Sequence, residues 1–129
     1  MNNIHFKIIV PFYNVEKWIK FCIKSIKRQK YKNFHCVLVN DAGALASIYH
    51  GTEHSKPNDE DVIIILDGDD WFANENVLQK LCDVYTEKEC WITYGSYMEF
   101  PMGRRGKFSK QIPKEIIEKR AFRKSEWMS

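Results

Sequence analysis

Short runs of apolar, β-branched residues alternate with segments of helical periodicity, and this alternation constrains the fold more than any other feature of the chain. The apolar runs span residues 6–10, 34–40, 62–66 and 90–94. Segments with apolar residues at every third or fourth position separate them. The expected order is therefore β-α-β-α-β-α-β, which is typical of an α/β fold with a mostly parallel sheet flanked by helices. The chain of 129 residues has room for one such unit.

Capping residues and helix breakers set the expected limits of the helices. Asn14 is a good N-cap for a first helix that runs to about residue 29, and Asn74 is a good N-cap for the third helix. Gly43 opens a short second helix. Residues 50–61 form an expected polar linker, in which Gly51 acts as a breaker.

A stripe of lysines lies opposite the apolar side of the first expected helix. It consists of Lys17, Lys20, Lys24 and Lys27. A solvated helix face explains the stripe without any ligand, and a surface that binds a polyanion is the alternative.

Lys and Arg number 20 against 17 Asp and Glu, and the resulting net charge of +3 is too small to indicate a nucleic-acid-binding protein.

Cysteine use and hydropathy predict a soluble, cytoplasmic chain. No two cysteines form a CxxC pair, and no histidine stands at zinc-ligand spacing, so we expect buried free thiols rather than disulfides or a zinc site. These thiols belong to Cys22, Cys36, Cys82 and Cys90. The longest strongly apolar run is far shorter than the roughly 18 to 20 residues of a transmembrane helix, and the N-terminus lacks the pattern of a signal peptide.

Acidic residues follow two of the expected strands. Asp41 comes after the second strand, and Asp67 opens a cluster of acids after the third. Ligands of parallel sheets bind beyond the carboxyl ends of the strands, so we expect a binding site there. Asp41 suits either a hydrogen bond to a nucleobase or the capping of the next helix. Tyr13, after the first strand, suits either stacking on a base or packing over the sheet edge.

The sequence Asp67-Gly68-Asp69 indicates metal chemistry. In an extended segment, residues two apart project to the same side, so these two carboxylates can face one cation. Hard oxygen ligands suit Mg²⁺ or Mn²⁺, which keeps coordination positions open for phosphate oxygens of a substrate. An Asp-rich turn that merely caps the following helix is the alternative. Trp71 and Phe72 are expected to anchor this acidic loop by hydrophobic contacts.

In their order along the chain, these stretches resemble the GT-A glycosyltransferases of the family 2 type. The resemblance rests on IIVPFYN at residues 8–14, VLVNDA at 37–42, GALAS at 43–47 and IILDGDDW at 64–71. It implies a Rossmann-like GT-A nucleotide-binding half and a nucleotide-sugar donor, usually a UDP-sugar. It further implies metal-assisted, inverting transfer of the sugar to a hydroxyl of a glycan, lipid or protein acceptor.

The resemblance also implies roles for single residues. Asp41 would contact the base, and Pro11 and Tyr13 would line the nucleotide. Asp67 would lie beside the ribose and the metal. Asp69 would bind the Mn²⁺ or Mg²⁺ ion through which the diphosphate is held.

Two departures from the family pattern suggest an alternative function. The family usually has a further helix and strand where Asp41 here runs almost directly into Gly43, and its catalytic base lies in a region beyond Ser129. No residue matches that base, and we interpret the acids Glu99 and Glu126 as surface residues. The alternative is a degenerate, non-catalytic domain that binds a nucleotide-sugar or a partner.

The alternation of strands and helices loosens near residue 100. Proline and glycine interrupt the pattern there, and Arg104, Arg105 and Lys107 form a basic loop. We therefore divide the chain into a family 2-like nucleotide-sugar-binding domain, residues 1–100, and an irregular basic segment, residues 101–129, interpreted as a shortened acceptor region.

Overall fold

The computed structural model describes residues 4–40, 44–95, 98–100 and 114. By its internal contacts the chain divides into two compact units, Met1–Cys90 and Trp91–Ser129. All helices and strands named below belong to the first unit. The functional boundary expected after residue 100 stays a prediction.

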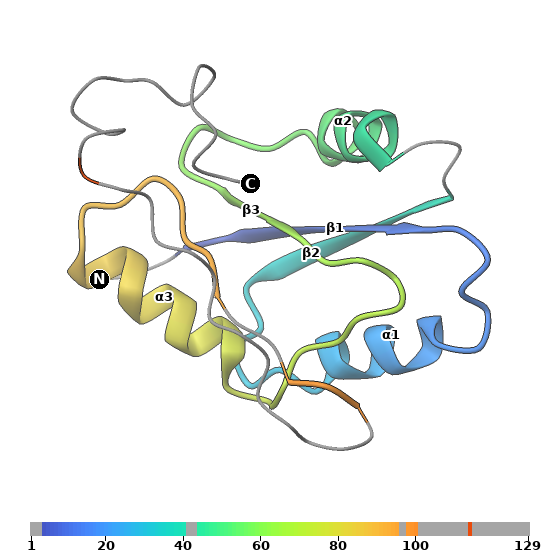
Figure 1. Cartoon of the computed structure of the whole chain (residues 1–129). Helices are drawn as coiled ribbons and strands as arrows, with labels where there is room; N and C mark the ends of the chain where they lie inside the picture. Colours follow the sequence, from blue (N-terminus) through green and yellow to red (C-terminus); the bar gives the residue numbers. More distant parts are fainter. Residues whose placement is uncertain (1–3, 41–43, 96–97, 101–113, 115–129) are drawn as a thin grey trace. The chain divides into compact units, whose positions relative to one another are not determined.

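The first unit is an open parallel sheet with helices on both sides (Figure 1). The strand order is β2-β1-β3, and β1 is parallel to both of its neighbours, which confirms the α/β fold. The elements in chain order are β1 (Phe6–Phe12), α1 (Ile19–Lys27), β2 (Phe34–Asn40), α2 (Ala44–Ser55), β3 (Val62–Ile65) and α3 (Val77–Glu87).

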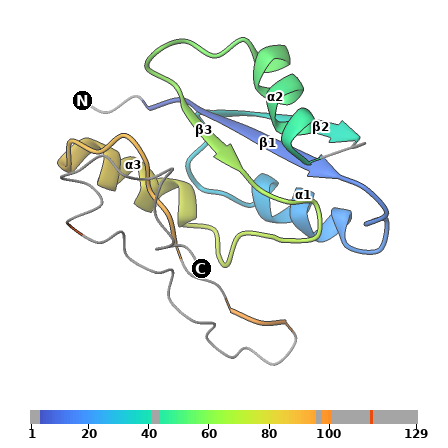
Figure 2. The same cartoon turned by 45° about the horizontal axis from the view of Figure 1, so that its top comes forward.

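The central strand β1 is buried on both faces because helices cover each of them. Figures 1 and 2 show α2 on one side of the sheet and α1 and α3 on the other. Phe6, Ile8 and Val10 project towards α1 and α3, and all three are fully buried. The remaining buried members of this core are Cys22, Ile26, Phe72, Leu78 and Cys82. Ile9 projects to the opposite face, where it meets α2.

Strand β1 continues through Pro11 to Phe12, two residues beyond the expected end. Successive N–H groups of a strand point to alternate sides, and the Pro11 position faces β3. Its carbonyl accepts a hydrogen bond from the Gly68 N–H at 2.9 Å. The residues before and after Pro11 can therefore carry the pairing with β2, so the missing N–H does not end the strand. The other two strands lie where the sequence predicted them, with β3 one residue shorter.

The prediction that Asn14 caps the first helix is wrong. Asn14 has φ of +52°, in the left-handed region that asparagine tolerates better than most residues, and it makes the sharp turn after β1. The Val15 carbonyl then accepts hydrogen bonds from the N–H groups of Trp18 and Ile19, both at 2.8 Å. The regular helix α1 consequently starts only at Ile19.

Asn74 is not the N-cap of the third helix either. Its side-chain oxygen accepts a hydrogen bond from the Asn76 N–H at 2.9 Å, and Asn76 is the residue that precedes α3. Such local bonds to the backbone two residues on are typical of asparagine in turns. Asn74 therefore shapes the loop before the helix.

Helix α2 is longer than expected, because residues 50–55 of the expected linker are helical. Gly51 lies inside the helix and does not break it. A Cβ at this position would lie 2.6 Å from Ile9 Cγ2 and 2.7 Å from Val39 Cγ2. The glycine lets the helix backbone lie directly on the sheet, and this close packing outweighs its poor helix propensity.

The expected fourth strand, residues 90–94, does not form. Trp91 is 96% exposed and Ile92 is 83% exposed, although tryptophan and isoleucine are common in strands. Strand propensity depends on a neighbouring strand and on a surface to pack against. In the described part of the chain, the sheet has three strands and none of them pairs with this segment.

All four cysteines are free thiols, but the prediction that they are buried is wrong for Cys36 and Cys90, which are partly exposed. Cys22 and Cys82 are buried in the core, and burial raises the pKa of the Cys22 thiol to about 12.

Among the described residues, no helix is both long enough and apolar enough to cross a membrane.

Candidate functional site

The acidic loop follows β3 and is tied to the end of β1. The Leu66 N–H donates to the Ile9 carbonyl at 3.0 Å, and the Gly68 N–H donates to the Pro11 carbonyl at 2.9 Å. The Asp70 N–H then donates to the Asp67 carbonyl at 2.9 Å and closes a tight turn. The expectation of an extended segment is therefore wrong, because this hydrogen bond folds the chain back within four residues.

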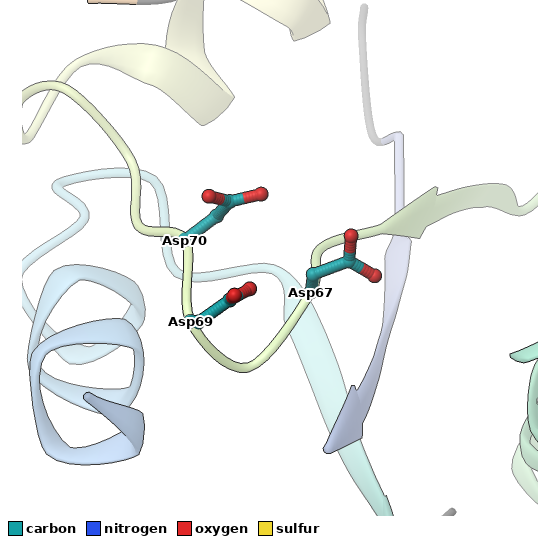
Figure 3. Close-up of side chains that lie close together, drawn as sticks. All are labelled: Asp67, Asp69 and Asp70. Atoms are coloured by element: carbon teal, nitrogen blue, oxygen red, sulfur yellow. The ribbon is translucent and has the colours of Figure 1, made fainter. Parts of the chain in front are cut away.

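The turn brings three carboxylates together (Figure 3). Ligand oxygens of Asp67, Asp69 and Asp70 all lie within 4.8 Å of one another, and the three residues are exposed. Asp69 and Asp70 project towards the arm of the loop that carries Asp67. A set of three hard oxygen donors open to solvent fits Mg²⁺ or Mn²⁺, which take carboxylate ligands and retain water. The sequence predicted Asp67 and Asp69 as ligands, but not Asp70.

The three negative charges repel one another. Partial burial raises the pKa of the Asp70 carboxyl above its ordinary value, and the charges of Asp69 and Asp67 raise it further. A divalent cation at the turn would offset this repulsion. The electrostatics of the turn therefore favour a bound cation, and so does its geometry.

Gly68 allows the turn to lie close to the end of β1 and the start of α1. A Cβ at this position would lie 2.8 Å from Phe12 Cβ, 3.0 Å from Ile19 Cδ1 and 3.1 Å from Val15 Cγ2. The first of these distances is too short for any real Cβ atom. Glycine is thus needed here for a close approach.

The two residues after the turn anchor it, as predicted. Phe72 is buried in the core beneath α1. Trp71 stacks on Trp18 with ring centroids 6.2 Å apart, and its ring lies 5.4 Å from that of Phe21. These contacts attach the acidic turn to helix α1.

A buried polar bridge, which the sequence analysis missed, holds the next part of the loop. Gln29 is fully buried, and its Nε2 donates to the carbonyls of Asn74 at 2.6 Å and Ser25 at 3.2 Å. Its Oε1 accepts from the Leu78 N–H at 3.0 Å, in the first turn of α3. The Ser25 hydroxyl also accepts from the Phe72 N–H at 3.1 Å. Helix α1 therefore positions both the loop and the start of α3.

The sequence contains one signal for this bridge. Gln29 follows Cys22 and Ile26 at helical spacing, so it continues the apolar face of the first helix. A glutamine on such a face has to find hydrogen-bond partners within the protein. Two of its three partners, Asn74 and Leu78, lie 45 and 49 residues away and could not be identified from local sequence.

Two of the remaining predicted site residues lie at the end of β1. Pro11 is buried near the end of β1, and Tyr13 is 64% exposed just after it. Because β1 and β3 are parallel neighbours, Tyr13 and the acidic turn lie at the same edge of the sheet. Asp41 lies outside the described residues. It follows Asn40, which pairs with Phe12 at the same end of the sheet.

The N-terminal part of the chain is similar to one known family. Residues 7–47 match the sequence profile described as Glycosyl transferase family 2. This segment covers nearly all of β1, all of α1 and β2, and the start of α2, and it ends before the acidic turn.

Two bacterial proteins are similar over short stretches. The first, Glycosyltransferase GlyA of Streptococcus pneumoniae serotype 4, is 50% identical over 40 residues, which is 31% of this chain and 6% of that protein. The second, Teichoic acid poly(glycerol phosphate) polymerase of Staphylococcus epidermidis, is 47% identical over 34 residues, which is 26% of this chain and 5% of that protein. The matched stretches thus span about a twentieth of the length of these relatives.

Proposed function

We propose that this chain, whose residues 7–47 match the profile of Glycosyl transferase family 2, binds a nucleotide-sugar and takes part in the transfer of its sugar to an acceptor hydroxyl. The acidic turn carries the proposal. It places three carboxylates within 4.8 Å of one another at the carboxyl end of a parallel strand, which is where ligands of such sheets bind.

The proposed donor is a UDP-sugar, held through a divalent cation. Asp67 and Asp69 would hold Mn²⁺ or Mg²⁺, and Asp70 completes the set of oxygen donors. Such a cation stabilises the negative charge of a departing nucleoside diphosphate. Among the protein's own groups, Gly68 and Trp71 fix the turn that presents the carboxylates.

The nucleotide would lie across the ends of β1 and β2. The Tyr13 ring is exposed at the end of β1 and offers a surface for stacking on the base. Pro11 supports this position from within the sheet, and Asp41 would accept hydrogen bonds from the base. In this arrangement the base and the diphosphate contact different strands.

A second candidate function is donor binding without transfer. Its support is the short connection after β2, which ends at Asn40 while α2 begins at Ala44. In the described part of the chain β2 is an edge strand. No further strand of the described sheet therefore lies beyond β2 to enclose the proposed base pocket. Transfer additionally requires a carboxylate that takes the proton of the acceptor hydroxyl.

The metal-dependent step is tested by calorimetric titration of the full chain with UDP, with Mn²⁺ present or chelated. We expect UDP binding in Mn²⁺ and a loss of at least about 10-fold in affinity on chelation or in Asp69→Asn. The matched control is Asp83→Asn on the exposed face of α3, which should bind like the unchanged protein. Equal affinity with and without metal would contradict the assignment.

A second titration tests the base pocket. Asp41→Ala should weaken UDP more than inorganic diphosphate, because the lost contact is to the base. A uniform loss for both ligands would indicate that Asp41 caps a helix instead.

Turnover separates the two candidate functions. The assay measures sugar transfer and donor hydrolysis at saturating UDP-sugar and Mn²⁺ with a panel of acceptors. Rates on the order of 1 to 10³ s⁻¹, which are usual for enzymes, support the transferase. Donor binding without turnover supports the binding domain.

A further inference from the structure

The exposed face of α1 is strongly basic. Lys20, Lys24 and Lys27 lie on it at helical spacing, Lys17 precedes them in the turn before the helix, and all four are exposed. Residues 17–32 contain seven Lys and Arg and no Asp or Glu. Because the whole chain carries a net charge of +3, the rest of it carries −4 once these seven charges are set apart. Within residues 1–100 the positive charge is thus concentrated on this one short segment, while residues 101–129, with nine Lys and Arg and three Glu, form a second basic stretch.

Aromatic side chains lie at the N-terminal end of this basic face. The Phe21 side chain is 37% exposed, and its ring lies 6.0 Å from that of Trp18. The Lys17 ammonium lies 4.9 Å from the Trp18 ring centroid, and the Lys20 ammonium lies 5.4 Å from the Phe21 centroid. Lysines and aromatic rings therefore share the same surface.

We propose that this face of α1 binds the surface of a bilayer that contains anionic lipids. Neighbouring lysines on a helix have Cβ atoms roughly 5–6 Å apart, and from Lys20 to Lys27 the helix rises about 10 Å. Spread along a convex helix, these ammonium groups cannot converge on one small anion. They can each meet a different headgroup of a flat anionic surface.

The aromatic cluster favours a bilayer over a stacked polymer such as a nucleic acid. Trp18 and Trp71 stack on each other, and the Lys17 ammonium lies over the Trp18 ring, so these ring faces are used within the protein. Stacking on bases requires free ring faces. Aromatic rings and lysines on one surface suit the headgroup level of a bilayer, where tryptophan, phenylalanine and lysine act together. The proposal does not depend on the proposed function.

The test is sedimentation of the full chain with vesicles. One set contains equal parts of phosphatidylglycerol and phosphatidylcholine, and the other contains phosphatidylcholine alone. We expect binding to the anionic set only, and we expect it to weaken as salt rises. Because each lysine near such a surface contributes about fivefold in affinity, replacing Lys20, Lys24 and Lys27 by Gln should weaken binding on the order of 100-fold.

Two further variants separate the face of α1 from net charge and from folding. Replacing the same three lysines by Arg keeps the charge and should keep the binding. Replacing Lys56, Lys80 and Lys88 by Gln removes the same charge elsewhere and should lower affinity far less. Circular dichroism checks that each variant is folded.

Several results would overturn the proposal. They are absence of binding to the anionic vesicles, equal binding to neutral vesicles, or an equal loss when Lys56, Lys80 and Lys88 are replaced. A polymer site would replace it if soluble polyphosphate bound through the α1 lysines while the vesicles did not.

Discussion

The substitution Gln29→Leu removes the polar bridge between α1, the loop after the acidic turn and α3. Leucine is similar in size to glutamine but cannot form hydrogen bonds. The change therefore removes three bonds, two donated by Nε2 and one accepted by Oε1, while it preserves most of the packing at a fully buried position.

The expected cost follows from the groups that lose a partner. The Leu78 N–H lies in the first turn of α3, where no helical carbonyl is available to it. The Asn74 carbonyl also loses its bond to Gln29 Nε2. Leaving a buried polar group unsatisfied costs about 1–3 kcal/mol, so two such groups, partly offset by the gain from burying an apolar side chain, give about 3 kcal/mol.

Urea unfolding monitored by circular dichroism measures this loss. About 3 kcal/mol is a large share of the roughly 5–15 kcal/mol of a typical domain, so the midpoint should fall clearly. Gln79→Leu is the matched control because it removes a glutamine whose bond to Asp83 is exposed. We expect that control to change stability by less than about 0.5 kcal/mol.

The reasoning is refuted if Gln29→Leu costs less than about 1 kcal/mol, or no more than Gln79→Leu. Either result would mean that the freed backbone groups find new partners, and that Gln29 does not fix the loop or the start of α3.

Three further changes test the packing and the charges of the site. Gly51→Ala places a carbon 2.6 Å from Ile9 Cγ2, and this overpacking should exceed the about 1 kcal/mol that alanine gains in a helix, giving a net loss of about 1 kcal/mol in thermal unfolding. Gly95→Ala, whose Cβ would meet nothing within 4 Å, should be neutral, and equal losses would contradict the argument. Gly68→Ala should displace the turn and weaken Mn²⁺ binding at least about 10-fold by calorimetry, and unchanged affinity would show that the turn tolerates the methyl group. The raised pKa of Asp70 means that the folded state holds its proton more tightly than the unfolded state, so the metal-free protein should lose stability as pH rises from the ordinary carboxyl value through the raised one. Asp70→Asn should remove that part of the pH dependence in melts with chelator, and an unaltered profile would assign it to other groups.

Local sequence was sufficient to predict the three strands of the sheet and the position of the acidic residues after the third of them. The three strands of the sheet are short apolar runs bounded by polar or turn-forming residues, and such runs carry the signal of buried parallel strands. Acids after the third run could be placed at the binding edge because every parallel strand of such a sheet ends there. The similarity of residues 7–47 to glycosyltransferase family 2 could also be predicted, since the motifs in this segment are contiguous stretches of residues.

The limits of the helices depended on contacts that local sequence does not contain. Asn14 and Asn74 have the chemistry of helix caps, but one makes the turn after β1 and the other shapes a loop. Gly51 has the composition of a breaker, yet it lies within α2 because the sheet beneath requires a position without a side chain. Segment 90–94 has strand propensity, but no strand pairs with it in the described part of the chain.

The sequence by itself determined where the acidic residues lie along the chain, and the tertiary structure decided how they are held together. Asp67 and Asp69 were identified from their spacing, but the hydrogen bond that closes the turn adds Asp70 to the cluster. The partners that fix this loop, Trp18 and Gln29, flank the two ends of α1, more than 40 residues earlier in the chain. Hydrophobic periodicity is a local property and can be read directly, whereas a buried hydrogen bond depends on which distant groups the fold brings within about 3 Å.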